Sequence, residues 1–176
     1  MEGPGSLTWA PVRADLVAPP VATALASWTE GTRVLGAEID PDLADTAAFC
    51  RRYSVDPADS ANCVVIAGRR GEETTYAACV LLATTRADVN GLVRRTLAAR
   101  KASFAPMDDA ISLTEMEYGG ITPIGLPPAW TILIDAAVLA REMVVIGSGL
   151  RRSKLALPAS ALSQLGQATV VEGLAG

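Results

Sequence analysis

The sequence predicts a single α+β domain built on a mixed, mostly antiparallel sheet with helices packed against it. Its 176 residues suit one domain with a substantial core, and half of them are hydrophobic. Runs of strand type are joined in pairs by short turns more often than they alternate with helices, which favours α+β over α/β. The chain has no internal repeat and no low-complexity linker, so we expect one folded unit over residues 16–176.

The first third of the chain is expected to contain a leader, two helices and a strand. Residues 1–15 are rich in glycine and proline and predict a flexible N-terminal leader. A helix is expected over 20–29, with proline in its first turn and glycine beyond its end. A strand is expected over 33–39. A second helix is expected over 40–53, where an Asp-Pro pair supplies the cap and the first helical position.

The middle of the chain predicts a hairpin, two helices and an additional short strand. A β-branched run at 63–68 and an apolar run at 74–84 are separated by RRGEE, a turn-type connection. The spacing of apolar residues predicts a helix over 88–100. A short strand is expected over 101–105, followed by a short helix over 107–116 with acidic residues in its first turn.

The last third of the chain predicts more strand than helix. Strands are expected at 131–136, 143–149, 154–158 and 168–173. A short helix over 158–166 ends at a glycine, which is the residue that most often terminates a helix.

The absence of histidine restricts the chemistry that this chain can perform. With no histidine, Ser-His-Asp and Cys-His nucleophilic systems and histidine-ligated metals are excluded. Cys50, Cys63 and Cys79 lack the spacing of metal ligands and lie in apolar contexts, so we expect reduced buried thiols and no metal. Acid–base chemistry must therefore use Asp, Glu, Lys, Tyr, a water molecule or the substrate itself.

The charge of the chain argues against broad, sequence-independent binding of nucleic acid. The formal net charge is −4, whereas such binding needs many Lys and Arg residues to neutralise phosphates. A small basic patch that grips one end of a nucleic acid remains open, and each short cluster of cations also fits a solvated surface. These clusters are Arg69-Arg70, Arg94-Arg95, Arg100-Lys101, and Arg151-Arg152 with Lys154.

The sequence also predicts where the protein resides. No apolar run is long enough to span a bilayer, and the first residues lack the basic segment and apolar core of a signal peptide. We therefore expect a cytoplasmic protein that does not interact with membranes, and the sequence leaves its oligomeric state open.

The segment EYGGITPIGLP at 117–127 predicts an ordered loop of fixed shape. Its glycines and prolines rule out a regular helix or a central strand. The N–H groups of Gly119 and Gly120 could converge on an oxygen, as in an oxyanion hole, while Pro123 and Pro127 keep the loop rigid. A tight connection between a helix and a strand explains the same residues equally well.

Several charged residues are candidates for a site, and each has a simpler explanation. Asp135 interrupts an apolar strand; it either marks the strand end or faces a pocket. Glu115 and Glu117 are either solvated acids or groups that position a water or bind an amino group. The segment GSGLRRSK at 147–154 could meet a phosphate or form a plain hairpin. Lys101 could contact a phosphate or a carboxylate, or be a surface lysine.

The glycine-rich loop resembles a known family motif. GGITPIG at 119–125 resembles the GG-x-x-P-x-G loop of the YbaK/ProX family of aminoacyl-tRNA editing domains, which is similar to the editing insertion of bacterial prolyl-tRNA synthetase. The neighbouring segments resemble those of the family in the same order, and the resemblance covers residues 33–173. It implies an α+β fold with a strongly curved mixed sheet.

The resemblance also implies an activity and a site. Such domains hydrolyse the ester of mischarged tRNA, free-standing or within prolyl-tRNA synthetase, and need no cofactor. The implied partners are the 3′ acceptor end of an aminoacyl-tRNA and a prolyl-tRNA synthetase. The implied catalytic residues are Gly119, Gly120, Asn62 and Asp135. The implied substrate-binding residues are Lys101, Glu117, Thr122, Pro123, Gly125, Gly147 and Ser148.

One position departs from the family pattern. Family members carry a lysine followed by Thr or Ser where this chain has Asn62 and Cys63. Lysine offers a charge, whereas Asn offers a neutral donor and acceptor. Either the specificity differs, or another cation such as Lys101 substitutes, or deacylation has been lost. The last case would leave a non-catalytic module that binds aminoacyl-tRNA or an aminoacyl-adenosine-like ligand.

Overall fold

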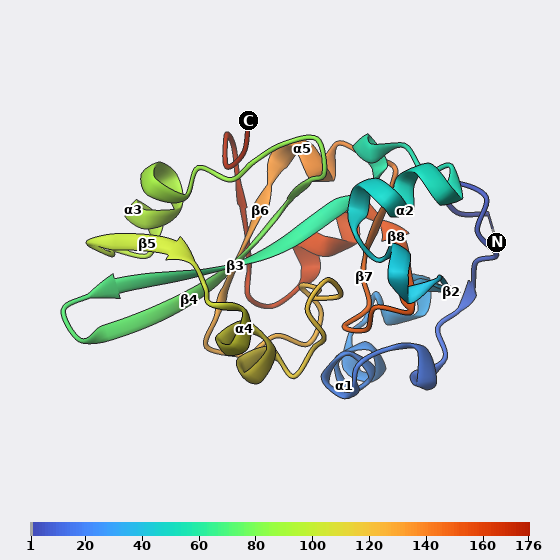
Figure 1. Ribbon diagram of the computed structural model, residues 1–176, viewed down its shortest axis with the longest axis horizontal. Helices are drawn as coiled ribbons and strands as arrows, with labels where there is room; N and C mark the ends of the chain where they lie inside the picture. Colours follow the sequence, from blue (N-terminus) through green and yellow to red (C-terminus); the bar gives the residue numbers. More distant parts are fainter. Residues whose placement is uncertain (1) are drawn as a thin grey trace.

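The computed structural model describes residues 2–176 and contains two β-sheets with helices packed around them (Figure 1). The first sheet has the antiparallel order β1-β2-β8-β7, with β1 at Ala10–Pro11, β2 at Leu35–Glu38, β8 at Ser153–Pro158 and β7 at Met143–Gly147. The second has the order β5-β3-β4-β6-β9, with β5 at Lys101–Phe104, β3 at Ala61–Arg70, β4 at Glu73–Leu82, β6 at Thr131–Asp135 and β9 at Ala168–Val171.

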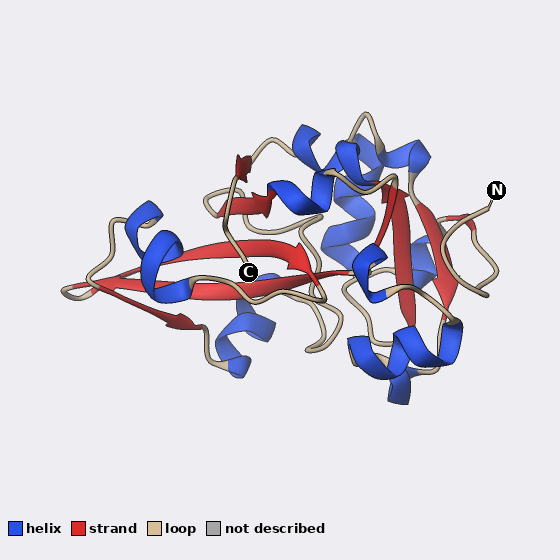
Figure 2. Ribbon diagram, turned by 90° about the horizontal axis from the view of Figure 1, so that it is seen from above, coloured by secondary structure: helices blue, strands red, loops and turns tan. Residues whose placement is uncertain are grey.

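The predicted α+β class is confirmed, with the strands divided between two sheets. In the second sheet, β5, β3 and β4 pair antiparallel, whereas β6 and β9 add in parallel. A single parallel bridge between Ser60 and Val145 joins the entrance of β3 to β7, so the two sheets meet there. Figures 1 and 2 show the β3–β4 hairpin extending away from this junction as an arm, with β5 and α3 beside its outer part.

The helices are short. They are α1 at Pro19–Ser27, α2 at Thr46–Tyr53, α3 at Arg94–Thr96, α4 at Met107–Thr114 and α5 at Ala136–Leu139. Short 3₁₀ turns and one π-helical turn at Val89–Val93 complete the connections. No helix in the described part of the chain is long and apolar enough to cross a membrane.

Two predicted helices are shorter than expected, one because it starts later and the other because it ends earlier. The helix expected over 40–53 is a turn at Pro41–Leu43 followed by α2, whose first N–H groups donate to the Asp45 carboxylate at 3.2 and 3.3 Å. The helix expected over 88–100 starts as expected, with Asp88 accepting from two N–H groups, but after a π-helical turn and one α-turn it ends at Thr96, and Ala98 adopts a left-handed φ of +50°. The apolar periodicity was correct, but the cap of α2 and the left-handed residue after α3 set the boundaries that differ.

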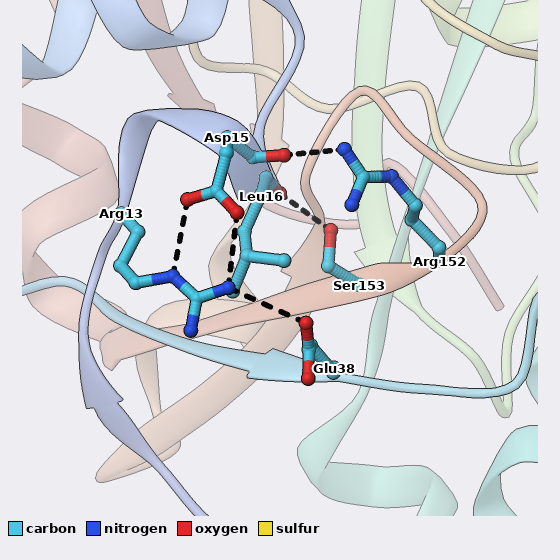
Figure 3. Close-up of polar contacts among 6 residues, drawn as sticks. All are labelled: Arg13, Asp15, Leu16, Glu38, Arg152 and Ser153. Atoms are coloured by element: carbon cyan, nitrogen blue, oxygen red, sulfur yellow. Dashed lines mark hydrogen bonds and ion pairs between the residues drawn. The ribbon is translucent and has the colours of Figure 1, made fainter.

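The N-terminal segment, expected as a loose leader, packs on the domain over its described residues 2–15. Trp9 is only 6% exposed, and its indole N–H donates to the carbonyl oxygen of Pro4 at 2.8 Å. Figure 3 shows how the following turn is held: the Arg13 guanidinium makes two 3.0 Å hydrogen bonds to the Asp15 carboxylate and reaches Glu38 on β2 at 3.4 Å. A buried aromatic and β-pairing outweigh the local preference of glycine and proline for loops.

The main hydrophobic core lies between the two sheets and is aliphatic, as the low aromatic content predicts. Ile132 and Ile134 on β6 belong to the same buried cluster as Leu155 and Leu157 on β8, and none of them is exposed. Ile124 from the glycine-rich loop is buried in the same cluster. The loop at 117–127 is therefore anchored in the core and forms one wall of the junction between the sheets.

Candidate functional site

A cavity of about 340 Å³ opens where the two sheets meet. This volume falls in the range of small-molecule pockets. Five segments form its wall: the start of α2, the start of β3, the end of β5, the glycine-rich loop and the β7–β8 ends. The lining residues are Ala44, Asp45, Thr46, Ala61, Asn62, Cys63, Val64, Val65, Phe104, Ala105, Tyr118, Gly119, Ile121, Gly147 and Lys154.

Lys154 supplies a buried cation to this cavity. It lies on β8 opposite Gly147 of β7, and only 8% of the residue is exposed. Its Nζ donates to the carbonyl oxygen of Ala44 at 3.2 Å, and no carboxylate within residues 2–176 forms an ion pair with it. Burial lowers the pKa of Lys154 to about 8, so the side chain is still mostly protonated at neutral pH.

Asn62 lines the same cavity from β3. Its Oδ1 accepts a hydrogen bond from the Thr46 hydroxyl at 2.7 Å, which fixes the amide against the first turn of α2. The amide nitrogen has no acceptor among the described residues and remains able to donate to a ligand. The structure therefore brings Asn62 and Gly119 of the expected catalytic set into one cavity.

The glycine pair of the loop does not act as two converging donors in this structure. Gly119 has φ +88°, lines the cavity, and its N–H finds no acceptor among residues 2–176. The Gly120 N–H, in contrast, donates to the carbonyl oxygen of Glu117 at 2.9 Å and closes a turn. A local turn already uses the Gly120 donor, so in this structure only the Gly119 amide is free to meet a ligand, and the expected role of Gly120 stays a prediction.

A second small-residue turn holds the glycine-rich loop in place. The Glu117 N–H donates to the carbonyl oxygen of Gly149 at 2.8 Å, and the Gly149 N–H donates to that of Gly120 at 2.7 Å. The Glu117 carboxylate accepts from the Arg151 N–H at 2.8 Å, and the Arg151 guanidinium donates to the carbonyl oxygen of Tyr118 at 3.2 Å. The carboxylate of Glu117, expected to bind substrate, is hydrogen-bonded within this contact.

Four further residues of the expected substrate-binding set are absent from the cavity lining. Thr122 and Pro123 are buried and do not line the cavity. Gly125 lies against α1, where a Cβ would be 2.6 Å from the carbonyl oxygen of Pro20. The Ser148 hydroxyl is buried and lies 2.7 Å from that of Ser153. Gly147, in contrast, lines the cavity itself.

Asp135 and Lys101 lie apart from the cavity lining. Asp135 ends β6 before α5 and is 3% exposed. Lys101 begins β5, is exposed, and lines a separate groove on the outer arm. Neither residue belongs to the set that lines the cavity, and their expected roles stay predictions.

The cysteines do not provide a nucleophile. Cys63 lines the cavity, but burial raises the pKa of its thiol far above neutral, and burial raises that of Cys79 to about 12. Both therefore remain protonated thiols at neutral pH. Within residues 2–176, no group of three or more Cys, Asp or Glu side chains is arranged to hold a metal ion.

Sequence reasoning placed Lys154 only within a basic cluster, and its role in the cavity was missed. The alternation of side chains between the two faces of the strand at 154–158 could have indicated this role. Leu155 and Leu157 pack into the main core, so Lys154 and Ala156 must point to the other face of the strand. A lysine at such a position in an otherwise apolar strand has to be buried or to line a cavity.

Comparison with known proteins relates the chain to one family. Residues 40–165 match the family described as the aminoacyl-tRNA editing domain. No curated protein sequence matches the chain significantly. The fold is similar to that of a "putative trans-editing enzyme for prolyl tRNA synthetase", with 18% identity, a TM-score of 0.74, and coverage of 89% of this chain and 97% of that one. It is also similar to the hypothetical protein APE2540, with 19% identity, a TM-score of 0.67, and coverage of 76% and 85%.

Proposed function

Because the chain belongs to the aminoacyl-tRNA editing domain family, we propose that it hydrolyses the ester of mischarged tRNA in trans. The observation that carries this proposal is the cavity at the sheet junction, which combines the Lys154 ammonium with the free donors of Asn62 and Gly119. An ester carbonyl develops negative charge during hydrolysis, and preorganised donors in a partly dry site stabilise that charge.

In the proposed reaction a water molecule adds to the ester carbonyl carbon. The carbonyl oxygen becomes an oxyanion, which the Lys154 ammonium and the Gly119 N–H stabilise. The bond to the ribose oxygen then breaks, and this oxygen takes up the proton that the attacking water gives up. The products are the free amino acid and a tRNA with its terminal hydroxyl restored. Asn62 orients the substrate or the water through its free amide donor.

Lys154 also accounts for the departure at Asn62. The family pattern expects a lysine at position 62, on β3, and the same cavity here receives a lysine from β8. A cation is thus present in the cavity although its position in the sequence differs. Lys101, the substitute expected from the sequence, does not line this cavity.

The alternative is a non-catalytic module that binds aminoacyl-tRNA or an aminoacyl-adenosine-like ligand. The specific observation in its favour is Asn62, a neutral side chain at the expected lysine position. The cavity would then retain the ligand without turnover. The two functions differ in whether amino acid is released, so one experiment separates them.

The test is deacylation of a panel of mischarged tRNAs by the purified protein. The panel includes tRNA for proline, since the similar structure is described as a trans-editing enzyme for prolyl tRNA synthetase. We expect the wild type to release amino acid and Lys154→Gln to lose about 100-fold to 1,000-fold of that rate, as for loss of an oxyanion donor. The double variant Asn62→Lys/Lys154→Gln should regain part of it.

The outcomes distinguish the two functions. No release over the whole panel, with binding of a non-hydrolysable aminoacyl-adenosine analogue retained, would establish the module and overturn the hydrolase. Release by the wild type that Lys154→Gln leaves unchanged would keep the hydrolase but remove Lys154 from it. Addition of prolyl-tRNA synthetase to the same assay tests whether a synthetase partner increases the rate.

A further inference from the structure

A second groove, of about 590 Å³, lies on the outer arm of the molecule and is strongly basic. Four cations line it, together with two polar and two alanine residues, and no acidic side chain takes part. The cations are Arg69, Arg94, Arg100 and Lys101, and the polar residues are Asn90 and Ser103. We call this set the basic groove. Its charge is opposite in sign to the net charge of −4 of the whole chain.

The fold places these cations close together without neutralising them. Arg69 on β3 and Lys101 on β5 are directly opposite each other in the antiparallel pair, an arrangement in which like charges repel. None of the four cations forms an ion pair within the described residues, and the Arg94 guanidinium donates only to the carbonyl oxygen of Asn90, at 2.8 Å. An anion bound among them would relieve this repulsion.

The edge strand β5 connects the basic groove to the cavity at the sheet junction. Residues 101–103 line the groove, and Phe104 and Ala105 line the cavity. From Lys101 in the groove to Phe104 at the cavity, the strand advances three residues, or about 10 Å. Figure 1 shows β5 beside α3 on the outer arm, with its C-terminal end directed toward the middle of the molecule. The groove and the cavity are thus adjacent along this one strand.

Exposed aromatic side chains lie at the cavity end of this path. Phe104 is 61% exposed and Tyr118 is 52% exposed, although both line the cavity. Exposed aromatics beside a basic groove are typical of sites for single-stranded nucleic acid, in which bases stack on the rings and cations follow the phosphates. The path from the groove into a cavity proposed to take an esterified RNA end favours RNA over an acidic protein partner.

We propose that the basic groove binds the phosphodiester backbone of the RNA strand whose 3′ end enters the cavity. Arg69, Arg100 and Lys101 contact its phosphates, and Phe104 stacks on a base between the groove and the cavity. This inference rests on the proposed function, because it takes an esterified 3′ end as the ligand of the cavity. It also explains how a chain of net negative charge holds RNA: the cations are gathered where the strand passes.

The test compares Arg69→Gln/Arg100→Gln with the matched control Arg33→Gln/Arg52→Gln. All four arginines are exposed, and the control pair lies outside both the groove and the cavity. The probe is an acceptor-stem RNA minihelix that carries no amino acid and has a single-stranded 3′ end. It is titrated at several salt concentrations. The groove variant should bind at least 10-fold more weakly, and its slope of log affinity against log salt should fall by about 1.4, roughly 0.7 for each lost phosphate contact.

Activity supplies a second readout. For the groove variant we expect a raised KM with a minihelix aminoacylated at its 3′ end. The rate with the corresponding aminoacyl-adenosine ester, which has no phosphate, should be unchanged. Equal affinity and equal salt slope for the groove variant and the control would overturn the proposal. A protein that binds the non-aminoacylated minihelix through the groove but deacylates nothing would support RNA binding by the groove and reject the hydrolase. Failure of the groove proposal and failure of the proposed function are therefore distinguishable.

Discussion

The Nζ atom of Lys154 lies 5.2 Å from the centre of the Phe49 ring. The ring belongs to a fully buried side chain of α2, so it presents an apolar face to a cation inside the protein. A cation–π contact and one hydrogen bond to the Ala44 carbonyl oxygen stabilise this ammonium, and no carboxylate of residues 2–176 forms an ion pair with it. Desolvation of such an ammonium lowers the free energy of unfolding, and this effect can be measured.

The first prediction concerns the pH dependence of stability. The folded-state pKa of Lys154 is about 8, below its ordinary value of 10.5. Burial is the main cause; Arg151 also lowers the pKa, and Cys50 and Asp45 oppose the shift. Between pH 8 and 10.5 the unfolded state therefore binds more protons, so the wild-type free energy of unfolding rises with pH relative to Lys154→Met, by roughly 3 kcal/mol at most.

Urea unfolding at pH 7, 8, 9 and 10.5 measures this difference. Lys154→Met should be the more stable protein at pH 7, and its advantage should shrink as pH rises. Lys101→Met, at an exposed position, is the control and should follow the wild type at every pH. A constant gap between Lys154→Met and the wild type across this range would mean that the ammonium is not buried in solution.

The second prediction concerns the pH dependence of deacylation. If the Lys154 ammonium stabilises the oxyanion, the enzymatic rate, corrected for spontaneous ester hydrolysis, should fall as pH rises through about 8. Lys154→Arg stays protonated in this range and should keep its rate to higher pH, even if that rate is lower. A wild-type rate that rises through pH 8 would instead indicate that the neutral amine acts as a base.

The fold was largely predictable because apolar periodicity and turn residues act locally. The hairpin of β3 and β4, the short strand β5 and the helix α4 lie where the sequence places them. The predicted boundary of a helix was wrong where a capping side chain sets its start, as Asp45 does for α2. The division of the strands into two sheets depends on pairing between distant segments, such as β2 with β8, and no local pattern encodes it.

The site was predictable in part. The glycine-rich loop was singled out from its own residues and Asn62 from the family resemblance, and both line one cavity. The hydrogen bond of the Gly120 amide could not be predicted, because a sequence shows that a glycine can offer its N–H but not that a turn already uses it. Lys154 was missed because its cavity is made by five segments, and only the folded chain brings α2 and β8 together.

The third prediction concerns the Thr122 hydroxyl. Thr122 is fully buried, and its Oγ1 has no hydrogen-bond partner within residues 2–176. Removing an unsatisfied buried polar group relieves its desolvation cost, so Thr122→Val should leave the free energy of unfolding unchanged or raise it by about 1 kcal/mol. Thr114→Val is the matched control, since its hydroxyl donates to the Ala110 carbonyl oxygen at 2.6 Å, and it should be destabilised by about 1–2 kcal/mol.

Thermal unfolding of both variants, with deacylation measured in parallel, decides the role of Thr122. If the hydroxyl instead binds substrate, as the resemblance implies, Thr122→Val should raise KM while stability stays the same. Destabilisation of Thr122→Val to the level of Thr114→Val would show that the hydroxyl has a partner in solution.

The fourth prediction separates folding from function at Gly120. A Cβ at this position would lie 2.7 Å from the backbone carbon and oxygen of Leu150, and backbone atoms cannot move aside as a flexible side chain can. Gly120→Ala should therefore destabilise the protein by about 1–3 kcal/mol, the range for overpacking. Gly166→Ala, where a Cβ meets nothing within 4 Å, should be close to neutral. Urea unfolding measures both. If Gly120→Ala kept wild-type stability and lost only deacylation, the Gly120 amide would have to act on the substrate, and the turn to Glu117 would have to open in the complex.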